Sequence, residues 1–183
     1  MASAQKFSCV VAMSKNRGIG KENRLPWHLK EDMKFFFHLT STAAEGKENA
    51  VIMGRNTWES IPEKYRPLSK RLNILLSRKL TQSEAPEKVT VCSSLQDALD
   101  VLAKKDNVDK IFVIGGAAVY KEALKHPSCY RLYITKVDKD FDCDVHFPDY
   151  DETLFKETSD PEVPAKKHED NGIEFTFHVY QRV

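Results

Sequence analysis

The sequence predicts an α/β fold: a single-domain, doubly wound and mostly parallel sheet with helices on both faces and antiparallel strands at its C-terminal end. Along the first two thirds of the chain, short apolar runs of strand length alternate with segments of helical periodicity, which is the pattern of βαβ units. The last third contains strand-like segments with no helix between them, which favours an antiparallel edge. A length of 183 residues suits one domain over residues 1–183.

The strands of the parallel part are predicted from apolar runs, as expected for strands that are buried on both faces. These runs lie at residues 7–13, 50–53, 72–76, 89–92 and 111–114. The helices between them are predicted from apolar residues at helical spacing and from capping and breaking residues, such as Ser94 as an N-cap. They cover residues 29–40, 57–61 and 94–104, with a fourth running from after Gly116 to about residue 125.

The C-terminal strands are predicted at residues 130–137 and 173–183. In the second of these, Ile173, Phe175 and Phe177 alternate with polar residues. A period of two indicates a strand with unlike faces, which is common in antiparallel sheets.

Composition limits the function. Hydrophobic residues make up 41% and charged residues 30%, which favours a packed core over disorder. The net charge of +1 argues against a generic binder of polyanions. The four cysteines form no C-x-x-C pair and no cluster with histidine, so we expect no metal site and a reducing compartment, the cytoplasm. The N-terminus does not read as a secretory signal, and no apolar run is long enough to span a membrane.

Glycine-containing turns follow several of the predicted strands. Gly18-Ile19-Gly20 does not complete a Rossmann fingerprint, because Asn23 stands where the third glycine is needed. Gly54-Arg55-Asn56-Thr57, Leu76-Ser77-Arg78 and Gly115-Gly116 each end a strand. Each alone is compatible with a solvated turn. Together they suit a dinucleotide with a pyrophosphate, and the guanidinium groups of Arg55 and Arg78 favour a further 2′-phosphate.

Two acids begin the first predicted helix. Glu31 and Asp32 can simply complement the helix dipole. Asp32, however, flanks the apolar stripe of Leu29 and Phe36, whereas Glu31 faces toward Phe35. A carboxylate beside an apolar face has a raised pKa and can donate a proton or anchor an amidine-like ligand edge.

A basic segment spans residues 64–79. It contains six lysines or arginines and no acid. A solvated basic face is one interpretation. The other is a site for small anionic ligands, because Arg71 stands just before an apolar strand and could point toward a ligand.

In order along the chain, these segments resemble the dihydrofolate reductase family. The resemblance runs through VVAMSKNRGIGKENRLPWHL, AVIMGRNTWESIPEKYRPLSKRLNILLSR and IFVIGGAAVYKEAL to the aromatic final strands, and it covers essentially the whole chain. It implies hydride transfer from NADPH to 7,8-dihydrofolate, giving tetrahydrofolate for one-carbon metabolism and thymidylate synthesis. It also implies a monomeric cytoplasmic enzyme that binds antifolates and needs no nucleic acid.

The resemblance also implies roles for individual residues. Asp32 would be the active-site carboxylate that binds the pterin, with Thr135 as its partner, and Arg71 would pair with the carboxylate of the glutamate tail. The pterin and benzoyl pocket would be walled by Val10, Val11, Met33, Phe36, Ile61, Leu68 and Ile114, with Tyr120 bordering the nicotinamide. The loop over both ligands would include Ala12, Ile19, Gly20, Leu25 and Trp27. Leu25 and Trp27 would also belong to the catalytic residues. The cofactor phosphates and their turns would involve Gly54, Arg55, Asn56, Thr57, Leu76, Ser77, Arg78, Gly115, Gly116, Ala117, Ala118 and Val119.

The sequence departs from the family pattern at two points. Animal members mostly carry glutamate as the acid, one residue further from the tryptophan, so Glu31 is the alternative to Asp32. Many members have a serine where this chain has Ala117 or Ala118, which leaves the phosphates to backbone N–H groups. The alternative functions are a pyrimidine reductase of the same fold and a non-catalytic nucleotide or nucleic-acid binder.

Overall fold

The structure, a computed structural model, describes residues 5–183. Residues 1–4, the start of the segment in which we expect no secretory signal, lie outside the described part. The helices are α1 (Lys30–Ser41), α2 (Arg55–Ser60), α3 (Leu95–Ala103) and α4 (Ala117–Lys125), and short 3-10 turns cover Glu63–Tyr65, Gln82–Glu84 and Glu152–Leu154. The strands are β1 (Phe7–Met13), β2 (Gly18–Gly20), β3 (Glu48–Gly54), β4 (Arg71–Leu76), β5 (Val89–Cys92), β6 (Val108–Gly115), β7 (Cys129–Val137), β8 (Val145–His146), β9 (Phe155–Thr158), β10 (His168–Asp170) and β11 (Ile173–Arg182).

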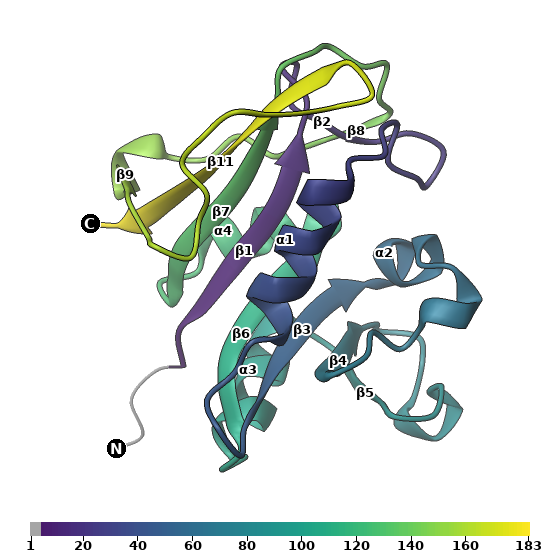
Figure 1. Ribbon diagram of the computed structural model, residues 1–183. Helices are drawn as coiled ribbons and strands as arrows, with labels where there is room; N and C mark the ends of the chain where they lie inside the picture. Colours follow the sequence, from purple (N-terminus) through teal and green to yellow (C-terminus); the bar gives the residue numbers. More distant parts are fainter. Residues whose placement is uncertain (1–4) are drawn as a thin grey trace.

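One large sheet forms the centre of the molecule (Figure 1). Its strand order is β10-β11-β7-β1-β6-β3-β4-β5, and β9 pairs with β11 beside this path. The strands from β7 to β5 pair in parallel, whereas β11 is antiparallel to β7, β9 and β10. The strands β2 and β8 form a separate two-stranded sheet. The predicted fold class is therefore confirmed.

The predicted elements agree with the observed ones to within a few residues, and the missed ones are short. Ser94 caps α3 as expected, because its hydroxyl accepts from the backbone N–H of Asp97 at 3.0 Å. The helix α2 begins at Arg55, two residues before the prediction, with Gly54 as its N-cap. The strands β2, β8, β9 and β10 hold two to four residues each, too few for a periodic signal.

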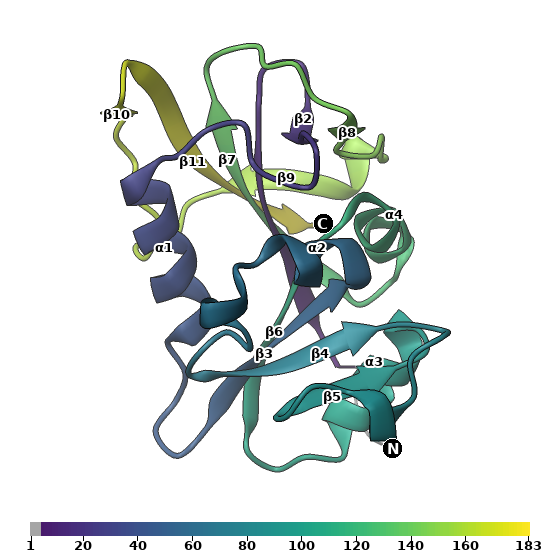
Figure 2. The same ribbon diagram turned by 90° about the vertical axis from the view of Figure 1, so that its right-hand side faces the viewer.

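Helices cover both faces of the sheet, with α1 on one side and α4 on the other (Figure 2). Alternate strand residues contribute to opposite faces. Ile52 and Val113 pack in the cluster that contains the apolar side chains of α3 and α4. Val51 and Phe112 pack in the cluster beneath α1 and α2. The parallel strands therefore lie between two apolar layers, which explains their unbroken apolar sequences.

The outer edge of β5 is covered by a side chain. Gln82 donates through its side-chain amide to the carbonyl oxygen of Val89 at 2.9 Å, and its Oε1 accepts from the N–H of Val91 at 2.8 Å. The amide thus satisfies two backbone groups that a neighbouring strand would otherwise pair with.

The four cysteines are free, and three of them are buried. Within residues 5–183, no helix is both long enough and apolar enough to cross a membrane.

Candidate active site

A partly buried carboxylate lies where α1 meets the central strands. Asp32, in the first turn of α1, accepts a hydrogen bond from the hydroxyl of Thr135 on β7 at 2.6 Å. Because Thr135 lies opposite Ala12 in the β1–β7 pair, the contact sits next to the carboxyl end of β1. Burial raises the pKa of Asp32 above its usual value, and the hydrogen bond from Thr135 opposes part of that rise. The sequence prediction of a raised pKa for this acid is thus supported.

The neighbouring acid has different surroundings. Glu31 is exposed and forms an ion pair with Lys34 at 3.2 Å on the outer face of α1. One residue along a helix turns the side chain by about 100°. Asp32 is therefore the acid of this pair that reaches the sheet, and Glu31 is not.

The predicted pocket residues divide between two faces. Phe36, Ile61, Leu68 and Ile114 pack against the cluster beneath α1 that contains Val10, and Ala12 packs against the adjoining one. The side chain of Val11 packs on the opposite face, with α3 and α4, because alternate strand residues point to opposite sides. Val11 can therefore offer only its backbone to a ligand beside Asp32. Large apolar side chains that remain exposed on α1 or in the loop before it are Leu25, Met33 and Phe37.

Two glycine turns and two helix N-termini adjoin one another. A side chain on Gly54 would meet Val119 of α4 at 3.1 Å, so the starts of α2 and α4 are neighbours. The N-caps of both helices are glycines, and neither N-terminus is capped by a side chain. Free N–H groups at adjacent helix N-termini favour phosphate groups.

Replacing Gly115 with alanine is expected to destabilise the fold by about 3 kcal/mol, because Gly115 has a φ of +135° and a Cβ there would lie 2.7 Å from the Thr57 hydroxyl. Urea denaturation of Gly115→Ala against wild type measures this. The matched control is Gly46→Ala, where φ is +78° but nothing lies within 4 Å, and the expected cost is about 1 kcal/mol. Equal destabilisation of the two variants would contradict the expected clash between the new Cβ at position 115 and the Thr57 hydroxyl.

The second group of predicted phosphate-binding residues lies at the start of α2 and the end of β4. Leu76 pairs with Gly54 across β3 and β4, which places the two strand ends side by side. The side chains of Arg55, Asn56 and Arg78 are exposed, and Arg55 pairs with Glu59 at 2.9 Å. The structure therefore brings the predicted cations to one edge of the sheet. Ser77 adds a hydroxyl that accepts from the backbone N–H groups of Lys79 and Leu80.

A buried arginine lies further along the face beneath α1. Arg71 is 9% exposed; it donates to the Thr40 hydroxyl at 2.9 Å and to the carbonyl oxygen of Ser69 at 2.8 Å. Its guanidinium also lies 5.2 Å from the centre of the Phe37 ring. Burial lowers the pKa of Arg71. Arg71 therefore turns inward, and its binding of an anionic ligand stays a prediction.

Sequence reasoning missed the residue that orders the chain before Arg71. Asn73, fully buried in β4, accepts from the N–H of Leu68 at 2.8 Å and donates to the carbonyl oxygens of Leu68 and Arg71 at 2.9 Å. A single amide inside the apolar run of β4 was the available signal, because a buried amide requires several partners. Asn73 thereby fixes the segment between Leu68 and Arg71.

The loop between β1 and α1 carries the remaining predicted residues. Ile19 and Gly20 belong to β2 and pair with β8. Trp27 is buried and packs on Phe141, with ring centres 5.2 Å apart. Its Nε1 is a buried donor with no acceptor in the described part of the protein, which suggests that a ligand or water supplies one. Tyr120 is buried and donates to the carbonyl oxygen of Val10 at 2.6 Å.

A doubly wound sheet that gathers a partly buried carboxylate and two uncapped helix N-termini at the carboxyl ends of its parallel strands is the arrangement of an α/β enzyme. The sequence profile of the family described as "Dihydrofolate reductase" matches residues 6–182. The chain therefore belongs to the dihydrofolate reductase family. Enzymes of this family are oxidoreductases that reduce dihydrofolate to tetrahydrofolate with a nicotinamide cofactor.

Relatives along the whole chain agree with this assignment. The dihydrofolate reductase of Drosophila melanogaster is 40% identical over 178 residues, which cover 97% of this chain and 98% of the relative. The dihydrofolate reductase of Gallus gallus is 45% identical over 185 residues, 97% of each chain. The solved structure of Schistosoma mansoni dihydrofolate reductase superposes with a TM-score of 0.86 at 44% identity and covers 99% of this chain and 100% of that one.

Proposed function

We propose that the protein reduces 7,8-dihydrofolate to 5,6,7,8-tetrahydrofolate with NADPH as the cofactor, and that Asp32 is the acid of this reaction. The observation that carries the proposal is the partly buried Asp32 carboxylate held by Thr135, in a chain that belongs to the dihydrofolate reductase family. NADPH oxidation by the purified protein with dihydrofolate tests it. Oxidation that requires dihydrofolate and stops with an antifolate supports the proposal, and oxidation with a pyrimidine substrate instead overturns it.

Asp32 supplies a proton and an anchor. A carboxyl group whose pKa is raised by burial keeps a larger protonated fraction near neutral pH than an exposed aspartate does. The hydroxyl of Thr135 fixes one carboxyl oxygen at 2.6 Å. That oxygen keeps a second lone pair, so the two carboxyl oxygens together can bind the amino group and ring nitrogen of a pterin. The proton then passes, directly or through a water molecule, to the ring nitrogen next to the carbon that is reduced.

The residues present fit a dinucleotide phosphate cofactor. The uncapped N-termini of α2 and α4 offer backbone N–H groups for a pyrophosphate, and the Thr57 hydroxyl lies against the Gly115–Gly116 turn. Exposed Arg55 and Arg78 would hold the 2′-phosphate that distinguishes NADPH from NADH. When bound, NADPH supplies the hydride. The protein orients the two ligands and excludes water around them.

Arg71 would bind the carboxylate of the glutamate tail of dihydrofolate. Replacing it with glutamine is expected to raise the KM for dihydrofolate about 10- to 150-fold, because a hydrogen bond to a charged group contributes about 1.5–3 kcal/mol. The kcat should change little, since this contact lies away from the reacting atoms. Steady-state kinetics measure both parameters.

The control for this variant is Thr40→Val, which removes an internal partner of the guanidinium but leaves its charge. We expect its KM to stay within about threefold of wild type, since most of the interaction comes from the charge. An unchanged KM in Arg71→Gln would exclude Arg71 from substrate binding.

The basic segment 64–79 favours this function over nucleic-acid binding. Arg71 is buried, and Arg66 donates to the carbonyl oxygen of Trp58 at 3.2 Å and lies over the Trp58 ring. These two of its six cations thus turn inward and reduce the charge available to a polyanion. We further propose that the chain forms one domain and acts as a cytoplasmic monomer, and its four free cysteines suit a reducing compartment.

A further inference from the structure

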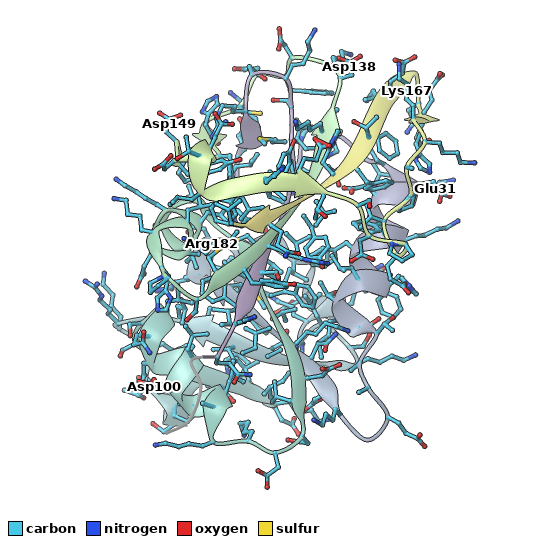
Figure 3. The ribbon with its side chains drawn as sticks, turned by 90° about the vertical axis from the view of Figure 1, so that its left-hand side faces the viewer. Glu31, Asp100, Asp138, Asp149, Lys167 and Arg182 are labelled. Carbon is cyan, nitrogen blue, oxygen red and sulfur yellow. The ribbon has the colours of Figure 1, made fainter. Side chains whose placement is uncertain are left out.

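A cavity of about 500 Å³ lies on the face of the sheet that is opposite to Asp32. The alternation of β7 explains most of its position: Thr135 faces α1, whereas its neighbours Ile134 and Lys136 line the cavity. Val137 and Phe175, which pack in the cluster with Trp27, complete the lining at the end of the sheet. Its volume is within the range of small-molecule sites, about 300–1000 Å³. Asp138 and Lys167, two further lining residues, lie at the same end of the molecule (Figure 3). The proposed function makes no use of this cavity.

The apolar part of the lining is partly aromatic. Met13 and Ile134 are buried side chains of the strands, and Tyr150 and Tyr180 add two rings. Tyr150 is held by edge contacts with Phe147 and Phe155, each with ring centres 5.9 Å apart. Fixed rings in the lining favour a flat apolar ligand, because they lose little freedom on binding.

Among the described residues, the charged part of the lining leaves one cation without an acid partner. Four cations and three acids line the cavity. Lys15 pairs with Asp138 at 3.9 Å, Lys167 pairs with Glu174 at 3.2 Å, and Arg17 pairs with Asp149, outside the lining, at 3.9 Å. The lining cation left is Lys136, and the lining acid left is Glu152, which is exposed.

In the part of the chain that the structure describes, Lys136 has no acid partner, and the acid partner of Arg17 is an exposed one. Within residues 5–183, Lys136 has no acid within ion-pair distance and donates to the Tyr180 hydroxyl at 2.6 Å. The guanidinium of Arg17 is fixed by its bond to the carbonyl oxygen of Pro148 at 2.7 Å, but its buried Nε has no hydrogen-bond partner in the described part of the chain. The carboxylate of Asp149, 3.9 Å from that Nε, is fully exposed. An ion pair to an exposed carboxylate is weak in water, so the Arg17 guanidinium can exchange Asp149 for the carboxylate of a ligand at little cost.

We propose that this cavity is a second small-molecule site that binds an aromatic carboxylate. The carboxylate would bind at Lys136 and Arg17, and the ring would pack against Tyr150 and Tyr180. A neutral aromatic compound of the same shape would lose the charge-assisted hydrogen bonds and bind more weakly.

The cavity is coupled to the loop beside Asp32. Ser14 and Arg17 line it and belong to the turn between β1 and β2. The Ser14 hydroxyl accepts from the N–H of Gly18 at 2.9 Å, and Gly18 begins the strand β2 that leads to the loop of Leu25 and Trp27. A molecule in the cavity therefore contacts this turn on the side that faces away from Asp32. It should change kcat without competing with the substrate. This coupling rests on the proposed function, whereas the binding itself does not.

The test uses 2-naphthoate as the probe and 2-naphthamide as its neutral counterpart. Backbone NMR shifts are followed during titration of the free protein and of the protein saturated with NADPH and an antifolate. We expect saturable binding of 2-naphthoate with a Kd on the order of 1 mM in both states, with shifts at Ser14–Gly18, and at least fivefold weaker binding of 2-naphthamide. Loss of the shifts in the saturated protein would place the probe at the Asp32 site and overturn the proposal.

Removing a lining cation and removing a lining acid should have opposite effects on 2-naphthoate binding, which distinguishes this site from general binding to the surface. Lys136→Gln should weaken 2-naphthoate binding at least about fivefold, Lys136→Arg should restore it, and Glu152→Gln should strengthen it about twofold. Lys121→Gln, in α4 and outside the lining, is the matched control and should change nothing. Unchanged binding in Lys136→Gln overturns the site. If 2-naphthoate binds but leaves kcat unaltered, the coupling to the loop is overturned. If the protein without 2-naphthoate does not reduce dihydrofolate, only the proposed function is contradicted, because the binding test does not depend on activity.

Discussion

Replacing Asp32 with asparagine is expected to lower kcat/KM for dihydrofolate by about 100-fold or more at pH 7, the usual range for loss of a general acid. The amide has nearly the size of the carboxylate, and its oxygen can still accept the hydrogen bond from Thr135. The variant therefore removes the proton and the charge while keeping the packing. Initial rates of NADPH oxidation at varied dihydrofolate concentration measure the effect.

The pH dependence of the same variant gives a second readout. Because burial raises the pKa of Asp32, its protonated fraction grows as the pH falls toward that pKa. The kcat/KM of wild type should therefore increase from pH 8 to pH 5, whereas the profile of Asp32→Asn should be flat over this window.

Glu31→Gln is the control, because Glu31 is the adjacent acid and its carboxylate pairs only with Lys34 on the exposed side of α1. We expect it to retain kcat/KM within about twofold, since an exposed ion pair at this spacing contributes less than 1 kcal/mol. If Asp32→Asn kept the activity and Glu31→Gln lost it, the acid would be Glu31 and the register of the family resemblance would shift by one residue.

Exchanging both Arg55 and Arg78 for glutamine is expected to reduce the preference for NADPH over NADH by about 100-fold or more. Each hydrogen bond to a charged phosphate contributes about 1.5–3 kcal/mol, which corresponds to about 10- to 150-fold per arginine. The loss should appear as a higher KM for NADPH, because NADH lacks the 2′-phosphate and should be used by the variant nearly as before.

The exposed pair of Arg55 with Glu59 does not oppose this prediction. Such pairs are weak in water, so Arg55 can exchange Glu59 for a phosphate at little cost. Lys79→Gln, which removes a cation next to Arg78, is the matched control and should alter the preference by less than about threefold. A double variant with an unchanged ratio of the two cofactors would remove both arginines from the cofactor site.

Much of this fold can be predicted from local sequence because its central strands are apolar on both faces. The runs at β1, β4 and β5 give the strand positions to within one residue, and the alternation in β11 indicates its antiparallel place. The prediction fails for β2 and β8, because their pairing joins segments about 125 residues apart and neither carries a pattern of its own.

Less of the candidate active site than of the fold can be predicted from local sequence, because its contacts join segments that are distant along the chain. Asp32 could be selected from its position beside an apolar stripe, but its contact with Thr135 spans 103 residues and depends on the strand order. The resemblance to a family supplied that pairing; periodicity did not. Asn73 and the cavity behind Thr135 were missed because buried hydrogen bonds and cavities arise from packing between elements, which no single segment encodes.

The side chain of Gln82 should affect how readily the protein aggregates at high concentration. An unprotected outer strand is a template on which another chain can add its own strand, and repeated addition leads to aggregates. At β5 the amide of Gln82 already occupies the carbonyl oxygen of Val89 and the N–H of Val91. A molecule that approaches this edge must first displace an internal hydrogen-bonding group of the same strength. The outer edge of β5 is therefore less available for pairing with a strand of another chain.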